Sequence, residues 1–206
     1  MTLGLKDLYY AVITMTNGVE TYGTPKKMAE AMKANLAVKT AEAKLFADDA
    51  LSESVKEFVS GDLTLGIKEL APEVVAELLG QIVDENGVVW AGDDEAPYVA
   101  VGFRAKKTGG KYKYVWLQRV QFAAPDESYE TKGESINFQT PEIKGTIYKT
   151  VGTGKWKADY VAEPTDTVAA GWFSAVKTYS PASSTSGTSG SGTSGSGTSG
   201  SGTSNP

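Results

Sequence analysis

The segment from residue 98 to 122, YVAVGFRAKKTGGKYKYVWLQRVQF, constrains the fold more than any other part of the chain. Two runs rich in β-branched and aromatic residues flank Gly109-Gly110, and glycine tolerates the positive φ angles of a two-residue hairpin turn. With this pair as the loop, Phe103 opposes Trp116 and Val99 opposes Val120. A shift by one residue would mix charged side chains into the apolar face. The segment therefore predicts a long β-hairpin.

This register gives the hairpin one apolar face and one mixed face. The apolar face comprises Val99, Val101, Phe103, Ala105, Tyr112, Tyr114, Trp116, Val120 and Phe122. The mixed face carries Arg104, Lys106, Lys113, Val115, Leu117 and Arg119, with Ala100 and Gly102 between them. A half-apolar second face predicts partial cover, either by another part of the chain or by another subunit. The aromatic residues of the first face are expected in the core rather than stacked on sugars or nucleic acid.

Composition excludes much enzyme chemistry. The chain has 206 residues, enough for one sizeable domain, and it contains neither cysteine nor histidine. Disulfides, thiolate nucleophiles, the usual zinc sites and histidine-based catalysis are therefore ruled out. The acidic pair Asp48-Asp49 is adjacent rather than spaced, so we expect solvated side chains, no metal and no cofactor. Two carboxylates from distant strands, as in a glycosidase, remain an open but weaker alternative.

Charge and hydropathy bear on the partners of the chain. No stretch approaches the roughly 20 apolar residues that span a bilayer, and the first ten residues lack the pattern of a secretory signal. We therefore expect no membrane insertion. The net charge of −5 argues against a dedicated nucleic-acid binder, because such proteins neutralise phosphates with a basic surface.

The charge is unevenly distributed along the chain. Residues 42–95 contain 14 acidic residues and three lysines, whereas residues 96–122 contain six basic residues and no acidic one. These segments could pair within one monomer, or the lysines could protect the edge of the hairpin. Alternatively, the acidic surface of one subunit attracts the basic hairpin of the next, head to tail.

The remaining pattern is typical of a mainly β protein, a β-sandwich or barrel with one flanking α-helix. Pro72 opens that helix and Gly80 ends it. Asn86-Gly87 predicts a small hairpin. Residues 47–54 show neither the helical nor the strand period of apolar residues, and they predict a long protruding loop with apolar residues at its tip. An ordinary loop packing back on its own domain is the alternative. We expect strands or short helices as follows: strands at 7–14, 36–46, 62–70, 128–132, 136–149 and 155–160, and helical turns at 26–33 and 168–176.

The C-terminal residues differ in composition from all the others. From residue 183 to residue 204 the chain is Ser, Thr and Gly, with GTSGS repeated at 187, 192 and 197. Such a segment has too few apolar residues for a core. We therefore divide the chain into a β domain over residues 1–180 and a flexible, disordered tail over residues 181–206.

Several short stretches resemble the major tail proteins, or tail tube proteins, of siphophages, the bacteriophages with long non-contractile tails. The resemblance covers residues 4 to 175 and depends on order and spacing. The matching stretches are GLKDLYY at 4–10, YGTP at 22–25, LFADD at 45–49, APYVAVGF at 96–103, GKY at 110–112, YVWL at 114–117 and NFQTP at 137–141.

The resemblance implies a structural virion protein, not an enzyme. Its homohexameric rings would stack into a tail tube, assembled in the host cytoplasm, through which genomic DNA passes into the host without specific binding. The implied partners are other copies of the chain and the tape measure, distal tail and tail terminator proteins. A monomeric adhesion or carbohydrate-binding β-module is the alternative.

Two sets of candidate contact residues follow from this resemblance. The candidate residues for contact between rings are Leu45, Phe46, Asp48, Asp49 and Leu51. The candidate residues for contact between subunits or for the lumen wall are Arg104, Lys106, Lys111, Lys113, Val115, Leu117 and Arg119. Changing Lys111 and Lys113 to glutamate is expected to impair assembly before folding.

Overall fold

The computed structural model describes residues 2–47, 50–85, 87–92, 94–125 and 141–178. It is mostly β, with 59% of residues in strands and 8% helical, as the sequence predicts. The predicted C-terminal tail lies outside the described residues. The elements are β1 (Thr2–Thr16), β2 (Val19–Tyr22), β3 (Lys26–Ala29), β4 (Ala31–Ala47), β5 (Ala50–Ile67), α1 (Pro72–Leu79), β6 (Ile82–Asp84), β7 (Gly87–Val89), β8 (Tyr98–Lys107), β9 (Tyr112–Phe122), β10 (Glu142–Ile147), β11 (Lys157–Ala162) and α2 (Thr167–Ala170).

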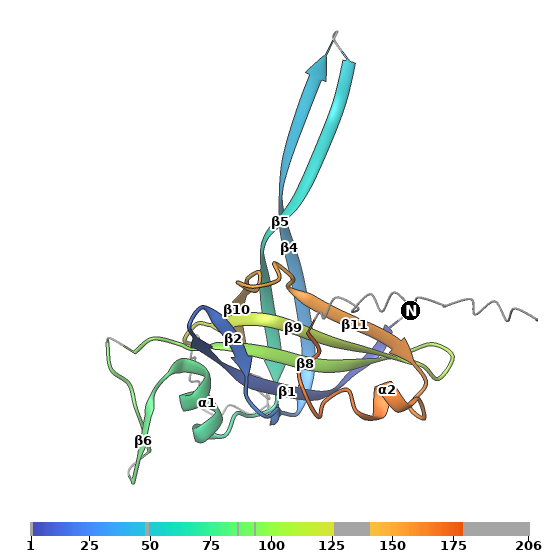
Figure 1. Ribbon diagram of the computed structural model, residues 1–206. Helices are drawn as coiled ribbons and strands as arrows, with labels where there is room; N and C mark the ends of the chain where they lie inside the picture. Colours follow the sequence, from blue (N-terminus) through green and yellow to red (C-terminus); the bar gives the residue numbers. More distant parts are fainter. Residues whose placement is uncertain (1, 48–49, 86, 93, 126–140, 179–206) are drawn as a thin grey trace, which may run out of the picture.

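The main sheet has nine strands and curves into a barrel (Figure 1). Its strands follow the order β2-β1-β8-β9-β10-β5-β4, with β11 also paired to β9 and β3 paired to β1. Because β4 starts two residues after β3 ends, β3 and β4 form one interrupted strand that joins β5 to β1. Joining the two sides of the sheet in this way closes the wall and hides most strand edges.

The main core fills the barrel and extends under α1. Leu65 and Ile67 of β5, Val99 of β8 and Leu117 of β9 all have 0% exposure. The helix adds Leu78 and Leu79 to this core. Its ends agree with the sequence signals: Pro72 stands at the N-terminus, and Gly80 adopts φ 74°, the left-handed conformation that glycine favours.

The predicted hairpin of β8 and β9 is present, but its register is shifted over most of its length. Val99 opposes Val120 as predicted, whereas Phe103 opposes Val115 instead of Trp116. Between Val99 and Val101 on β8, β9 carries one more residue than its partner strand, which is a β-bulge. Because side chains alternate along a strand, this extra residue reverses the faces of all residues of β9 between the bulge and the turn.

The predicted division of the hairpin into an apolar and a mixed face is therefore wrong. Val115 and Leu117, expected on the mixed face, lie in the barrel core with Phe103. Tyr114 and Trp116 lie instead on the opposite face, and they are still buried, at 2% and 0% exposure. The prediction that these aromatic residues belong to a core is confirmed.

The second face of the hairpin is covered by the C-terminal segment of the same chain. Trp172 and Phe173, which follow α2, pack on Tyr114 and Trp116. The indole Nε1 of Trp116 donates a hydrogen bond to the carbonyl oxygen of Trp172 at 3.0 Å. The sequence leaves open whether another part of the chain or another subunit covers this second face. In the structure, another part of the same chain covers it. The predicted helical piece is shorter than expected and spans Thr167–Ala170.

Two further predictions need correction. Residues 26–33 are not helical; they form β3 and the start of β4, because pairing with β1 and β5 outweighs a short stretch of helix propensity. The strand predicted at 155–160 lies at Lys157–Ala162. Residues 128–132 and 136–140 lie outside the described residues, and the remainder of the predicted 136–149 strand is present as Glu142–Ile147.

Candidate assembly surfaces

The predicted protruding loop is the outer part of a long two-stranded ribbon formed by β4 and β5. Strand β10 pairs with β5 only from Gly61 to Gly66, and beyond Gly61 the described residues of β5 pair only with β4. The ribbon continues to the Ala47–Ala50 pair and extends away from the barrel (Figure 1). At roughly 3.3 Å per residue, it extends on the order of 30 Å beyond the last interstrand contact with the barrel.

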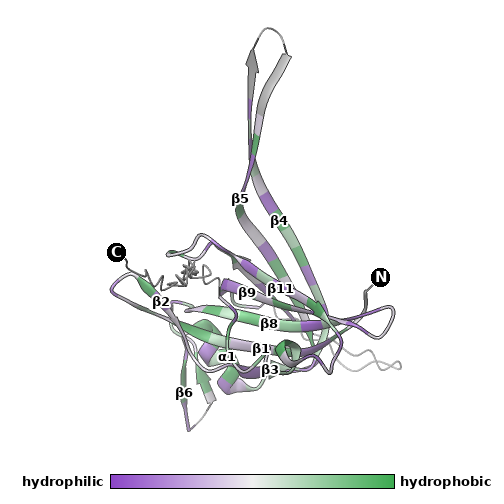
Figure 2. Ribbon diagram, turned by 45° about the vertical axis from the view of Figure 1, so that its right-hand side comes forward, coloured by the Kyte–Doolittle hydropathy of each residue, from purple (hydrophilic) through white to green (hydrophobic). Residues whose placement is uncertain are grey.

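The side chains of the ribbon are open to solvent on both faces. Every residue of β4 from Ala37 to Lys44 is exposed. Apolar and polar residues are mixed along the ribbon (Figure 2), and Val38, Val55 and Val59 are 46%, 54% and 55% exposed. Ion pairs on the ribbon, such as Lys39 with Asp62, are exposed and contribute little stability. The ribbon therefore presents apolar surface that a partner could cover.

The base of the ribbon is fixed to the barrel by side chains. The ring of Phe58 stacks on Trp156, with centroids 4.5 Å apart and planes 3° from parallel. Glu57 forms an ion pair with Lys149, which lowers the pKa of the Glu57 carboxyl. The ribbon thus leaves the barrel in a defined direction, and among the described residues beyond Gly61 β5 pairs only with β4.

The structure places three of the predicted ring-contact residues toward the end of this ribbon. By their backbone, Leu45 and Phe46 lie in β4 and Leu51 lies in β5. Asp48 and Asp49 lie outside the described residues. Val38, Val55 and Val59 were not among the predicted contact residues. The signal that could have identified them is that they are apolar residues among polar ones in a long strand.

Three basic residues of the predicted hairpin set are bound within the monomer. Arg104 pairs with Asp7, Lys113 pairs with Asp159 at 3.0 Å, and Arg119 pairs with Glu20 at 3.3 Å. For Asp159, the hydrogen bond from Lys113 and the charge of Lys157 outweigh burial, so the pKa of its carboxyl is lowered. These side chains therefore stabilise the monomer fold.

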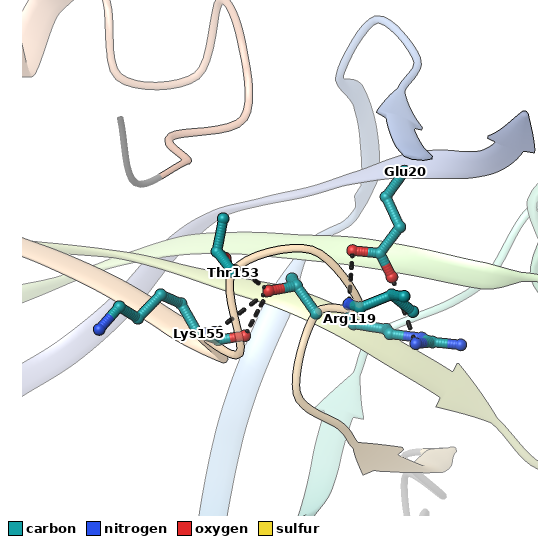
Figure 3. Close-up of polar contacts among 6 residues, drawn as sticks. Glu20, Arg119, Thr153 and Lys155 are labelled. Carbon is teal, nitrogen blue, oxygen red and sulfur yellow. Dashed lines mark hydrogen bonds and ion pairs between the residues drawn. The ribbon is translucent and has the colours of Figure 1, made fainter. Parts of the chain in front are cut away.

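The pair of Glu20 and Arg119 connects three parts of the barrel (Figure 3). The guanidinium of Arg119 also lies 3.9 Å from the ring centroid of Tyr98, and Glu20 accepts a hydrogen bond from the backbone N–H of Val151 at 3.2 Å. Burial, and then the negative charge of Glu20, raise the pKa of Tyr22 to about 12. Strand β2 is thereby held to β9 and to the turn after β10.

That turn is itself held by hydrogen bonds, which Figure 3 also shows. The hydroxyl of Thr150 lies 2.7 Å from that of Thr153 and donates to the carbonyl oxygen of Lys155 at 3.0 Å. The turn borders an open hollow of about 600 Å³ between β2 and the C-terminal segment. Residues 151–155, which superficially resemble a phosphate loop, are therefore a structural turn.

Lys106 and Lys111, the other two basic residues of the predicted set, are exposed at the turn between β8 and β9. Neither belongs to an ion pair with any residue that the structure describes, and the same holds for the neighbouring Lys107. Both outer edges of the hairpin are occupied, since β8 pairs with β1 and β9 pairs with β10 and β11. Along these paired stretches the hairpin therefore offers no free strand edge to a neighbouring subunit.

A second exposed apolar surface lies on the small hairpin of β6 and β7, which the sequence predicts correctly from Asn86-Gly87. This hairpin forms a separate two-stranded sheet beside α1. Ile82, Val83, Val89 and Trp90 are 66%, 45%, 49% and 50% exposed. Isolated two-stranded hairpins are marginally stable in water, so further cover of these residues would be favourable.

The described residues contain no group of three or more acidic, histidine or cysteine side chains placed to hold a metal ion. None of the helices found in the described ranges has the length and apolar character needed to cross a membrane.

The fold and these surfaces define a closed β-barrel with a projecting ribbon and two further exposed surfaces. Neither the protein-family models nor the curated proteins contain a match to this chain.

Proposed function

We propose that this chain is the structural subunit of a siphophage tail tube, located in the virion, in which homohexameric rings stack into a conduit for genomic DNA. The observation that carries the proposal is the ribbon of β4 and β5. In the described residues, it leaves the barrel with both outer strand edges unpaired beyond Gly61 and with exposed valines on its surface. The resemblance over residues 4 to 175 supports the same conclusion from the sequence.

A ribbon of this kind is better explained by assembly than by monomer stability. Its outer half contributes no side chain to either hydrophobic cluster of the described residues. Unpaired strand edges and exposed valines favour association with other chains, so a protein that keeps them has a partner for them or aggregates. A neighbouring copy in the next ring would cover both features and give the stacking direction of the tube.

The charge of the chain suits a conduit for DNA. A net charge of −5 disfavours tight binding of phosphates, and three of the basic hairpin residues are paired within the monomer. In the proposed tube, DNA slides past the subunits without specific contacts. The ends of the tube would contact the tape measure, distal tail and tail terminator proteins.

Electron microscopy of the purified protein over a range of concentrations tests the proposal. The expected result is rings or tubes of uniform diameter, together with a concentration-dependent sedimentation profile. A single monomeric species at every concentration would contradict it. If that monomer bound immobilised glycans, the adhesion-module alternative would be supported instead.

A further inference from the structure

The small hairpin of β6 and β7 combines its exposed apolar residues with acidic ones. Glu85 lies in its turn, Glu73 lies on α1, which contacts the hairpin, and the backbone of Glu95 lies against Gly80 at the end of α1; all three have exposed side chains. None of these three takes part in an ion pair with the described part of the chain. We call this region the acidic surface and define it as Glu73, Ile82, Glu85, Trp90 and Glu95.

The turn between β8 and β9 carries the opposite charge. Lys106, Lys107 and Lys111 lie around Gly109-Gly110, and Lys6 of β1 lies near this end of the hairpin because it pairs with Arg104, two residues before Lys106 on β8. Glu163 and Asp166 are near Lys111, since all three line a shallow hollow of about 350 Å³, and these two carboxylates offset two of the charges. The four lysines still exceed the two carboxylates. We call Lys6, Lys106, Lys107 and Lys111 the basic turn.

These two surfaces lie at opposite ends of the same strand. The acidic surface precedes Tyr98, where β8 begins, and the basic turn follows Lys107, where β8 ends. Ten residues of β-strand span roughly 33 Å. That distance is several times the screening length of about 8 Å at physiological ionic strength, so the two surfaces cannot neutralise each other within one molecule. Figure 1 shows the β6 hairpin and the β8–β9 turn on opposite sides of the barrel.

We infer that the acidic surface of one copy binds the basic turn of the next copy, which makes a head-to-tail lateral contact within a ring. The binding partner is a second copy of this chain, because the chain carries both complementary surfaces and they lie too far apart to interact within one molecule. The aliphatic stems of the lysines can lie on Ile82 and Trp90 while their ammonium groups approach Glu85, so the contact combines apolar cover with charge attraction.

Such a contact uses two different surfaces and is therefore heterologous, which produces a closed ring or an open filament rather than a two-fold dimer. The inference deepens the proposed function, on which it rests for the ring. It also locates the lateral contact away from the strand edges of β8 and β9, which are occupied in the monomer.

Site-specific cross-linking tests the contact, since the chain contains no cysteine of its own. Glu85→Cys and Lys111→Cys variants are mixed at a concentration at which the wild type assembles, and a short bismaleimide is added. The mixture is expected to give a covalent dimer, whereas each variant alone gives none. A double variant with both changes should give a ladder of higher species.

A matched control uses Met15→Cys. Met15 is 48% exposed and lies near the end of β1 that is close to the start of β8, on the same side as the acidic surface. Mixed with Glu85→Cys, it should give no cross-linked dimer. Equal yields from the control and the test pair would overturn the inference.

Charge reversal provides a second measurement. Glu85→Lys or Lys111→Glu alone should weaken self-association measured by sedimentation about tenfold, and combining the two should restore much of it. If the wild type forms tubes but the mixed Glu85→Cys and Lys111→Cys variants, which assemble as well, give no covalent dimer, this contact is refuted and the tube is left intact. Cross-linked oligomers without rings or tubes would support the contact and refute the tube. An absence of any association would refute both.

Discussion

The indole ring of Trp116 lies directly on Gly102, its cross-strand partner. A Cβ atom placed on Gly102 would lie 2.8 Å from three ring atoms of Trp116, closer than such atoms approach in folded proteins. The same indole donates its N–H to the carbonyl oxygen of Trp172. Gly102 therefore allows the ring to lie flat between the hairpin and the C-terminal segment.

Gly102→Ala should destabilise the monomer by about 2 kcal/mol, because Trp116 must move and its cover by the C-terminal segment loosens. Urea unfolding followed by tryptophan fluorescence measures this effect. Gly4→Ala is the matched control, since Gly4 is also in a strand of the sheet and no atom lies within 4 Å of the added Cβ. Equal stability of the two variants would show that Trp116 does not depend on Gly102.

The sequence predicts the hairpin but not its faces, for a physical reason. Alternation along β9 fits either register until the position of the bulge is known, and no residue type marks the extra residue opposite Ala100. Both faces of β9 are apolar, since Val115 and Leu117 face one core and Tyr114 and Trp116 face another. With both faces buried, hydrophobic pattern alone does not specify the register.

The candidate contact surfaces were predictable in part. The protrusion is predicted by a stretch around residue 50 whose apolar residues show neither helical nor strand period. The hairpin of β6 and β7 is predicted by Asn86-Gly87. Which charges remain unpaired does not follow from sequence. Lys113 and Arg119 find Asp159 and Glu20, which lie 46 and 99 positions away in the chain, whereas Lys111 does not. Long-range pairing of this kind is decided by the closure of the barrel.

Tyr22 gives a prediction for alkaline conditions. Its pKa is raised to about 12 from an ordinary value of 10.0, first by burial and then by Glu20. A raised folded-state pKa contributes stability that is complete below pH 10 and is lost as pH rises through 12. The unfolding free energy of the wild type should therefore fall more steeply between pH 10 and 12 than that of Tyr22→Phe, by up to about 1 kcal/mol per pH unit.

Chemical unfolding at matched pH values compares the two proteins directly. Lysines also titrate in this range, but both proteins contain the same lysines, so the difference between their slopes belongs to Tyr22. Parallel stability curves for the wild type and Tyr22→Phe over this range would contradict the assignment.

Glu77 on α1 gives a prediction for acid conditions. Its pKa is lowered from 4.5, first by the hydrogen bond from Lys26 and then by that from Tyr10, whose hydroxyl lies 2.5 Å from the carboxylate. A lowered folded-state pKa contributes stability that is complete above pH 4.5 and is lost as pH falls. Glu77→Gln should be less stable at pH 7 by about 1 kcal/mol, a modest cost because the side chain is 39% exposed.

The difference between the wild type and Glu77→Gln should disappear as the pH falls well below 4.5, and thermal unfolding at a series of pH values measures it. Glu73→Gln is the control, because Glu73 lies on the same helix and is exposed. A constant difference between Glu77→Gln and the wild type at all pH values would refute the electrostatic explanation and leave only a packing effect.

Shortening the ribbon separates the fold from the assembly. In the proposed variant, residues 43–55 are replaced by Asn-Gly, which joins Glu42 to Lys56, a directly opposed pair, through a turn suited to hairpins. Phe58 with its partner Trp156, and Glu57 with its partner Lys149, are retained, so the base of the ribbon stays fixed. The variant should unfold within about 0.5 kcal/mol of the wild type, because the deleted residues belong to neither hydrophobic cluster of the described chain.

The same variant should fail to stack. If the outer ribbon binds the next ring, electron microscopy will show single rings or small oligomers where the wild type gives tubes. Glu85→Cys and Lys111→Cys introduced into the shortened chain should still give the lateral cross-link. Tubes of normal length from the shortened chain would show that the outer ribbon is not needed for stacking, because residues 43–55 are absent from that chain. Loss of both tubes and cross-links with an unchanged unfolding free energy would instead show that lateral contact depends on stacking.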